Sequence, residues 1–178
     1  MRLFHVSEES DIVNFIPLIP KRDDLDKSKG LVWALTDKCL PNFLTPRNCP
    51  RVAYHASEKT TPEDISKFFS SSSRHCVAVE HNWYERISQT SLYLYEFDTS
   101  NFYLQDEAAG YFVSEKTEIP IAKTKLDNLF FELFSRNVEV RILNYLWHLS
   151  ELVKESTLNW SLCRMRNAKP NKHQKGTL

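Results

Sequence analysis

The hydrophobic pattern of this chain changes its period after Ile121, and that change constrains the fold more than any other feature. Before it, β-branched and aromatic residues form short strand-like runs, the clearest of which are Cys76–Glu80 and Ser91–Phe97. After it, apolar residues recur at helical spacing on one face: Leu126, Leu129, Phe130, Leu133 and Phe134. Strands followed by helices are typical of an α+β fold.

Further runs extend this pattern. Strands are expected over Leu3–Val6, Leu31–Leu35, Arg51–His55, Cys76–Glu80, Ser91–Phe97, Asn101–Leu104, Tyr111–Val113, Ile119–Ile121 and Val138–Ile142. Helices are expected from Thr61 to Phe69, over Leu126–Phe134 and around Leu146–Val153, with short turns at Leu40–Leu44 and Asn82–Ile87. We therefore predict a mixed, mostly antiparallel and strongly bent sheet, or sheets of that kind, with C-terminal helices.

The length of 178 residues falls in the range of one domain, and an apolar share of 42% is too high for a disordered chain. Residues 1–168 are predicted to form this single domain. No acid follows Glu155, whereas several lysines and arginines do, so the body is acidic and the end basic. Residues 169–178 are predicted to be a flexible basic tail.

Neither a membrane-spanning run of roughly 18 to 20 apolar residues nor a signal peptide is visible, and we expect a cytoplasmic protein without a membrane partner. Cysteines stand at 39, 49, 76 and 163 without a CxxC pair. They predict buried or free thiols and no metal site.

Three glycines are too few for a phosphate-cradling loop, and no P-loop, GxGxxG, HExxH or GxSxG motif occurs. Chemistry must therefore come from residues that folding brings together. The charged stretch Lys21–Gly30 lacks apolar periodicity and is predicted to be an exposed, mobile loop.

Five segments carry a resemblance to a known family: Arg2–Ser7, Val32–Asp37, Leu92–Glu96, Ala109–Pro120 and Leu162–Ala168. Together they resemble an uncharacterised bacterial family, domain of unknown function 6886. The resemblance covers nearly the whole chain, and the family has no established activity to carry over.

The order of these segments is also similar, more remotely, to ADP-ribosyltransferase-like domains. That resemblance implies an NAD cleft, with His5 on the first strand, Trp33 or Tyr54 as the middle aromatic residue, and Ser114 to Glu118 near the late acid. It implies NAD as the substrate of a transferase, with Glu115 or Glu118 as the catalytic acid. The implied NAD contacts are His5, Ser7, Trp33, Tyr54, Tyr111 and Ser114.

In such a site the histidine would hydrogen-bond the ribose, an aromatic ring would stack on nicotinamide, and the carboxylate would favour the developing sugar cation. Ordinary structural roles stay open beside these: a backbone-bonded His5, core positions for Trp33 and Tyr54, and a solvated face for Glu115 and Glu118.

Arg164 and Arg166 suit contacts with phosphate or nucleic acid, and equally suit ion pairs within the chain. The alternative to the transferase is therefore a noncatalytic domain that binds a nucleotide, a nucleic acid or another partner. A small-ligand or metal-independent hydrolase is a third hypothesis. The sequence leaves open whether the protein is an enzyme, its acceptor substrate and its oligomeric state.

Overall fold

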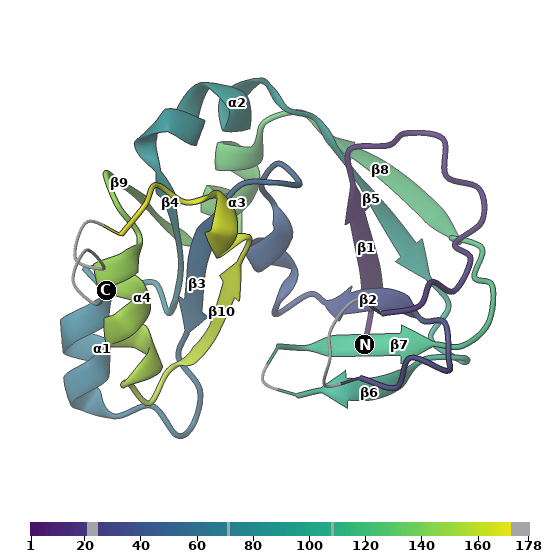
Figure 1. The fold of residues 1–178 in the computed structure, drawn as a ribbon, viewed down its shortest axis with the longest axis horizontal. Helices are drawn as coiled ribbons and strands as arrows, with labels where there is room; N and C mark the ends of the chain where they lie inside the picture. The colour runs from purple at the N-terminus through teal and green to yellow at the C-terminus, as the bar shows by residue number, and fades with distance from the viewer. Residues whose placement is uncertain (21–24, 71, 108, 172–178) are drawn as a thin grey trace, which may run out of the picture. The chain divides into compact units, whose positions relative to one another are not determined.

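The structure, a computed structural model, describes residues 1–20, 25–70, 72–107 and 109–171 (Figure 1). The chain divides into two compact units, each made of two separate segments. Unit 1 contains Met1–Leu44 and Ser91–Asp127, and unit 2 contains Thr45–Thr90 and Asn128–Leu178. The single domain expected over residues 1–168 stays a prediction, and each unit is described by itself.

Unit 1 is built on an antiparallel sheet with six strands in the described residues, in the order β6-β7-β2-β1-β5-β8. These strands are β1 (Leu3–Ser7), β2 (Val32–Thr36), β5 (Leu92–Phe97), β6 (Tyr103–Asp106), β7 (Tyr111–Ser114) and β8 (Ala122–Leu126). A short 3-10 helix, η1 (Leu40–Phe43), follows β2. The first strand of the chain, β1, therefore lies inside the sheet, between β2 and β5.

One face of this sheet carries a hydrophobic core. Side chains alternate between faces along a strand, and residues directly opposite each other on antiparallel strands share a face. Leu3 lies opposite Phe97, and both pack around Phe15 in a cluster with Val32, Ala34 and Tyr95. We call this side the core face. Tyr95 also donates its hydroxyl to the carbonyl of Glu9 at 2.7 Å, which fixes the segment between β1 and Phe15 over the core.

The other face, which we call the front face, carries the side chains that alternate with these. Phe4 lies opposite Leu35, and Leu35 lies opposite Tyr111. Trp33 is two residues before Leu35 on β2 and so points to the same side. The front face therefore gathers Phe4, Trp33, Leu35 and Tyr111 from three neighbouring strands.

Unit 2 contains a mixed sheet of four described strands, in the order β10-β3-β4-β9, in which only β4 and β9 run parallel. Its strands are β3 (Arg51–His55), β4 (His75–Glu80), β9 (Glu139–Leu143) and β10 (Asn159–Cys163). Its helices are α1 (Pro62–Phe68), η2 (His81–Trp83), α2 (Tyr84–Gln89), α3 (Leu129–Ser135), α4 (Trp147–Lys154) and η3 (Met165–Asn167). Residues from β3, β4, α1 and α4 form an apolar cluster that includes Val52, Tyr54, Phe68, Leu149 and Val153.

The start of α1 follows the sequence signal. Thr61 caps the helix by accepting a hydrogen bond from the Asp64 backbone, and Pro62 takes the first helical position. The Asp64 carboxylate in turn accepts the backbone N–H of Thr157 at 2.6 Å. The cap therefore also ties α1 to the segment that leads into β10.

The predicted α+β class is confirmed, and most of the expected strands form where the sequence indicated them. Two expectations are wrong in detail. The strand expected over Ile119–Ile121 forms later, as β8, and the helix expected from Leu126 begins only at Leu129, because Leu126 ends β8. Strand β10 was not predicted.

The expectation of strongly bent sheets is wrong. The two sheets form separate ladders of strands that are four to six residues long, and neither is strongly curled. Strong curvature is built with bulges and glycine kinks. Among the described strand pairs, the register shifts only once, between Leu104 and Asp106 of β6.

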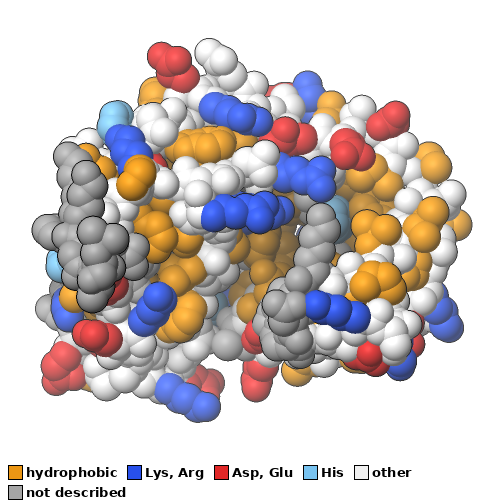
Figure 2. Space-filling view, viewed as in Figure 1, with side chains coloured by type: hydrophobic (Ala, Val, Ile, Leu, Met, Phe, Trp, Pro, Cys, Tyr) orange, Lys and Arg blue, Asp and Glu red, His pale blue; other side chains and the backbone are white. Residues whose placement is uncertain are grey.

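The described part of the predicted loop Lys21–Gly30 is mostly exposed, while residues 21–24 lie outside the described residues. The predicted tail is described only to Asn171, and residues 172–178 lie outside. Among the described residues, no helix has the length and apolar character needed to cross a membrane. Charged side chains of both signs are mixed over the surface shown in Figure 2.

Candidate functional site

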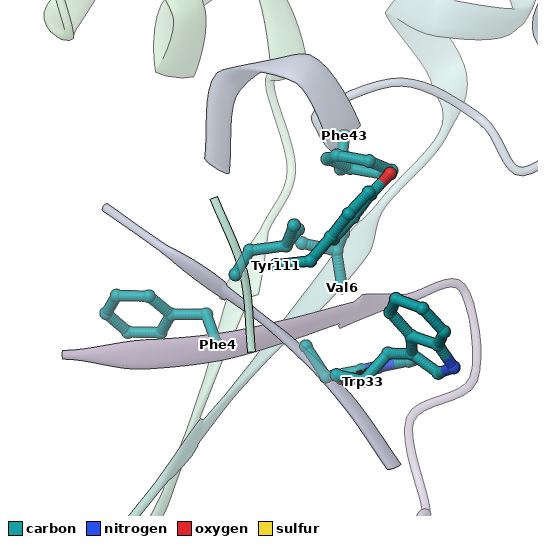
Figure 3. A pocket seen from close by; sticks show the side chains of 7 residues that line it. Phe4, Val6, Trp33, Phe43 and Tyr111 are labelled. Atoms are coloured by element: carbon teal, nitrogen blue, oxygen red, sulfur yellow. Dashed lines mark hydrogen bonds between the residues drawn. The ribbon is translucent and has the colours of Figure 1, made fainter. Parts of the chain in front are cut away.

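A small pocket opens on the front face of the unit 1 sheet (Figure 3). Its volume is about 100 Å³, and the residues that line it are Phe4, His5, Val6, Trp33, Leu35, Phe43 and Tyr111. Strands β1, β2 and β7 supply every lining residue but Phe43, which comes from η1. The pocket follows from the alternation described above, because it places aromatic and aliphatic side chains of adjacent strands on one side.

Three of the aromatic rings that line it, those of Trp33, Tyr111 and Phe43, form one connected wall. The Trp33 and Tyr111 rings meet edge to face, with centroids 5.3 Å apart and planes at 85°. The Phe43 ring approaches Tyr111 at 5.9 Å and 63°. In Figure 3 the Tyr111 ring extends from its strand toward Phe43. Such walls favour a flat, apolar or aromatic ring, which gains edge-to-face and offset contacts with each of them.

A glycine allows η1 to approach the sheet. Gly110, directly before β7, has a φ of +64°, and a Cβ atom there would lie 2.5 Å from the Sγ of Cys39. Cys39 is the residue that precedes η1. Because glycine adopts this backbone conformation without strain and leaves this space open, Gly110 allows Cys39 and the start of η1 to lie close to the sheet.

His5 lines the pocket, but its ring is directed to the core face, since its neighbours Phe4 and Val6 on β1 occupy the front face. There it packs against Phe15 at a centroid distance of 4.9 Å. Its Nδ1 lies 3.0 Å from the Trp33 carbonyl oxygen, and because a carbonyl only accepts, Nδ1 donates. This bond supports the backbone of Trp33, and the ribose contact expected of His5 stays a prediction.

Ser7 shares the parity of His5 on β1. Its hydroxyl accepts a hydrogen bond from the Glu9 backbone at 3.1 Å and so shapes the turn that leaves the strand. Ser7 is not among the residues that line the pocket.

Ser114 and Glu118 are both buried and bind each other. The Ser114 hydroxyl donates to Glu118 Oε1 at 2.5 Å and accepts the Lys116 backbone N–H at 3.1 Å. The backbone of Glu118 exchanges two hydrogen bonds with Phe15, at 2.8 and 3.0 Å. These contacts close the turn after β7 over the core face, and neither residue lines the pocket.

Glu115 lies at the surface, directly after β7. Its carboxylate accepts hydrogen bonds from Lys29 Nζ and from the Tyr103 hydroxyl, both at 3.0 Å. These two bonds, that of Lys29 first, lower the pKa of the Glu115 carboxyl, so it stays ionised at neutral pH. Tyr103 lies opposite Val113, which in turn lies opposite Trp33, so the group belongs to the front face. Glu115 does not line the pocket itself.

Tyr54 belongs to the core of unit 2. It is fully buried, its hydroxyl donates to the Phe68 carbonyl at 3.1 Å, and its ring packs on Phe68 and Phe69. Burial raises the pKa of the Tyr54 hydroxyl. A ring covered in this way offers no face on which a ligand could stack.

Arg164 and Arg166 are exposed on unit 2. Arg164 has a left-handed backbone with φ of 55° before η3, and its Nε donates to the Arg47 carbonyl at 3.2 Å. Arg166 lies within η3. This bond places the backbone of Arg47, which is also exposed, next to Arg164.

Sequence reasoning missed Phe43 as a pocket wall and Gly110 as the reason for its position. The available signal was the pairing of scarce glycine with a following aromatic strand, at Gly110 and Tyr111. Within the described residues, no group of three or more His, Cys, Asp or Glu side chains is placed to hold a metal ion.

Comparison with known proteins gives one match. A family model covers residues 4–168, and it is described as a family of unknown function, DUF6886. This confirms the likeness to an uncharacterised family and adds no support for the remoter likeness to ADP-ribosyltransferases. No curated protein and no solved structure matches the chain.

Proposed function

Since the chain belongs to the family of unknown function DUF6886, which supplies no activity, we propose from its geometry that unit 1 binds NAD through the nicotinamide ring. We further propose that the protein is an ADP-ribosyltransferase-like enzyme in which Glu115 supports cleavage of NAD. The observation that carries the proposal is the convergence of Trp33 and Tyr111, from β2 and β7, in one pocket.

The pocket suits the ring and not the whole dinucleotide. Pockets that enclose drug-sized ligands measure roughly 300 to 1,000 Å³, whereas this one measures about 100 Å³. Nicotinamide is planar and electron-poor, and the aromatic walls can contact both its edge and its face. In this proposal the ribose and phosphates of NAD lie outside the pocket.

The chemistry assigned to Glu115 is electrostatic. When the bond between ribose C1′ and the ring nitrogen breaks, its electron pair neutralises the pyridinium, and positive charge develops on the sugar until a nucleophile adds to C1′. A carboxylate near that charge stabilises the transition state. The lowered pKa of Glu115 keeps the required negative charge at neutral pH.

The binding half is tested by NAD-dependent shifts in melting temperature and by titration calorimetry. NAD should raise the Tm of the unmodified protein with increasing concentration. Trp33→Ala and Tyr111→Ala should each weaken binding by about 1 to 3 kcal/mol, the usual loss for a stacking aromatic side chain. Phe112→Ala is the matched control, because it removes a ring from the next position of β7, on the core face.

The catalytic half is tested by nicotinamide release. Glu115→Gln keeps the shape of the side chain and removes its charge, so NAD should still raise the Tm while release falls at least about tenfold. His5→Ala should weaken NAD binding indirectly, by loosening the backbone of Trp33. If millimolar NAD gives neither heat nor a Tm shift with the unmodified protein, the proposal is wrong.

A second candidate function is favoured by the three exposed arginines of unit 2, Arg47, Arg164 and Arg166, because the hydrogen bond from Arg164 Nε to the Arg47 carbonyl brings their segments together. In this alternative the protein is a noncatalytic nucleotide- or nucleic-acid-binding domain. Binding of a single-stranded oligonucleotide should then weaken steeply with salt, and Arg164→Gln with Arg166→Gln should flatten that dependence. Binding unaffected by these two substitutions would exclude the arginines as the contact.

A further inference from the structure

We propose that the pocket of unit 1 admits a single six-membered ring and excludes a fused two-ring base, and that Phe43 is the residue that sets this limit. The inference rests on the proposed function, since it presumes that a ring enters the pocket. It adds which class of ring is admitted and which side chain selects it.

The volume of the pocket limits which rings can enter it. A closed apolar cavity of roughly 150 Å³ is known to accept one benzene ring. The pocket measures about 100 Å³ and is partly open, so a single ring can enter with part of its edge outside. A purine base adds a second fused ring, and one of the walls would have to move to admit it.

Phe43 determines the width of the pocket, because the other lining residues belong to the sheet. Strands β1, β2 and β7 are joined by continuous ladder pairs, including Phe4 with Leu35 and Leu35 with Tyr111. Their side chains therefore have fixed positions across the sheet. Among the described residues that line the pocket, only Phe43 comes from outside these strands. Its ring, 5.9 Å from that of Tyr111, closes the side of the pocket that the sheet leaves open.

The hydrogen bonds and packing of η1 hold Phe43 in place. The turn of η1 is closed by hydrogen bonds from Asn42 N to Cys39 O at 3.1 Å and from Leu44 N to Pro41 O at 3.3 Å. Leu40 and Leu44 on either side of Phe43 are buried. Cys39 is packed against Gly110. The wall is anchored at both ends, so it acts as a fixed stop for a larger ring.

The polarity of the pocket lining determines which part of a nucleotide can enter. The described residues that line the pocket include no Lys, Arg, Asp or Glu. A phosphate entering such a site would lose its hydration without gaining a cationic partner. Of a nucleotide, the base is therefore the part that enters.

The test compares mononucleotides that share a ribose 5′-phosphate and differ in the ring. Nicotinamide mononucleotide and UMP carry one six-membered ring, and AMP carries a purine. By titration calorimetry, the unmodified protein should bind both single-ring nucleotides at least about tenfold more tightly than AMP, as size discrimination in a rigid pocket allows.

Phe43→Ala should reduce this preference to within about threefold, mainly through tighter AMP binding, because it removes the stop. Phe43→Trp should weaken the single-ring nucleotides at least about tenfold, since it fills the pocket. Phe112→Ala, on the core face, should leave the preference unchanged. Melting curves establish that each variant is folded, and Phe43→Leu, expected to shift the preference in the same direction, serves if the alanine variant is not.

The possible failures are distinguishable. AMP binding as tight as that of nicotinamide mononucleotide, or full discrimination retained in both Phe43→Ala and Phe43→Leu, overturns the inference and leaves the NAD proposal standing. Binding of nicotinamide mononucleotide without UMP would show that ring charge governs the choice, and overturns it as well. If neither the mononucleotides nor NAD bind the unmodified protein, both the inference and the proposed function fail.

Discussion

Burial determines the chemistry of the cysteines residue by residue. Cys49 and Cys76 are fully buried, and burial raises the pKa of each thiol from 9.0 to about 12. Burial also raises the pKa of Cys39. Cys163, on β10, is partly exposed, and its Sγ lies 3.4 Å from the Ser161 hydroxyl. Because the thiolate is the reactive form, the four free cysteines should differ widely in reactivity.

We predict that a thiol reagent such as DTNB labels Cys163 rapidly in the folded protein and the buried thiols only on unfolding. The colour released in the fast phase should correspond to one thiol per chain, and Cys163→Ser should abolish that phase. Rapid release from a second thiol would mean that one of the buried sites opens far more often than its packing indicates.

The same raised pKa values predict a loss of stability in alkali. Above pH 9 the unfolded chain ionises Cys49 and Cys76, while the folded chain keeps them protonated to about pH 12, so rising pH favours unfolding. The loss should be about 1 to 2 kcal/mol per thiol at pH 10, measured by urea denaturation under reducing conditions. Cys76→Ala should flatten the fall between pH 8 and 10. Val79→Ala, a buried neighbour without a titratable group, should lower stability without changing that slope.

The candidate site was predictable in its residue types and not in their directions. Trp33 and Tyr111 stand out in the sequence as aromatic residues on strand-like runs, and the structure places both in the pocket. The direction of His5 depends on the pairing of β1 with β2 and β5, which no local pattern specifies. The position of Phe43 depends on the packing of Cys39 against Gly110. Local periodicity cannot predict a contact between residues so far apart in the sequence.

At the scale of elements, α3 shows how a helical stripe can be misassigned. The sequence places Leu129, Phe130, Leu133 and Phe134 on one buried face, yet only the two leucines are buried, and Phe134 is 59% exposed. Phe130 stacks between Tyr84 and Phe134, at centroid distances of 5.3 and 6.4 Å. With seven residues, α3 buries a narrower stripe than the apolar pattern suggests.

We predict that Leu129→Ala lowers the free energy of unfolding by about 2 to 5 kcal/mol, the usual range for truncating a buried leucine. Phe134→Ala on the same helix should change it by less than about 1 kcal/mol, because its ring is largely exposed. Urea denaturation of the two variants measures both. Equal losses would show that the exposed aromatic stack contributes as much as the core.

Two strands show why the sequence did not predict all strands and their boundaries. Strand β8 contains Lys123 and Lys125, and its exposure and charge are typical of an edge strand. The predicted strand was placed before it because Ile119 and Ile121 are apolar. Strand β10 has the sequence NWSLC, which is weak in β-branched residues. It is extended because it forms five consecutive pairs with β3. Tertiary pairing overrides local preference in both places.

At the scale of the whole molecule, the protein has no net charge, and unit 1 exposes several aliphatic side chains. The formal net charge at pH 7 is zero and the sequence pI is about 7.0. Backbone hydrogen bonds between Phe15 and Glu118 bring two exposed segments side by side. The exposed aliphatic residues of these segments are Val13, Ile16, Leu18, Ile19, Ile119 and Ile121. Low net charge removes the repulsion that would keep such surfaces apart.

We therefore predict that static light scattering at low salt is highest near pH 7 and falls on either side. Ile119→Lys should lower scattering at pH 7 more than Ser66→Lys, which adds the same charge at an exposed position of α1. Equal effects of the two variants would attribute the association to net charge alone.

The central place of β1 has a consequence for synthesis on the ribosome. β1 makes two register pairs with β2 and five with β5, and all of the segment Thr45–Thr90 is translated before β5. At roughly 5 to 20 residues per second, the nascent chain carries one open edge of β1 for several seconds. During that time Leu3 and Phe4, which are buried in the finished fold, are accessible to chaperones. Slow codons within the intervening segment would lengthen this interval.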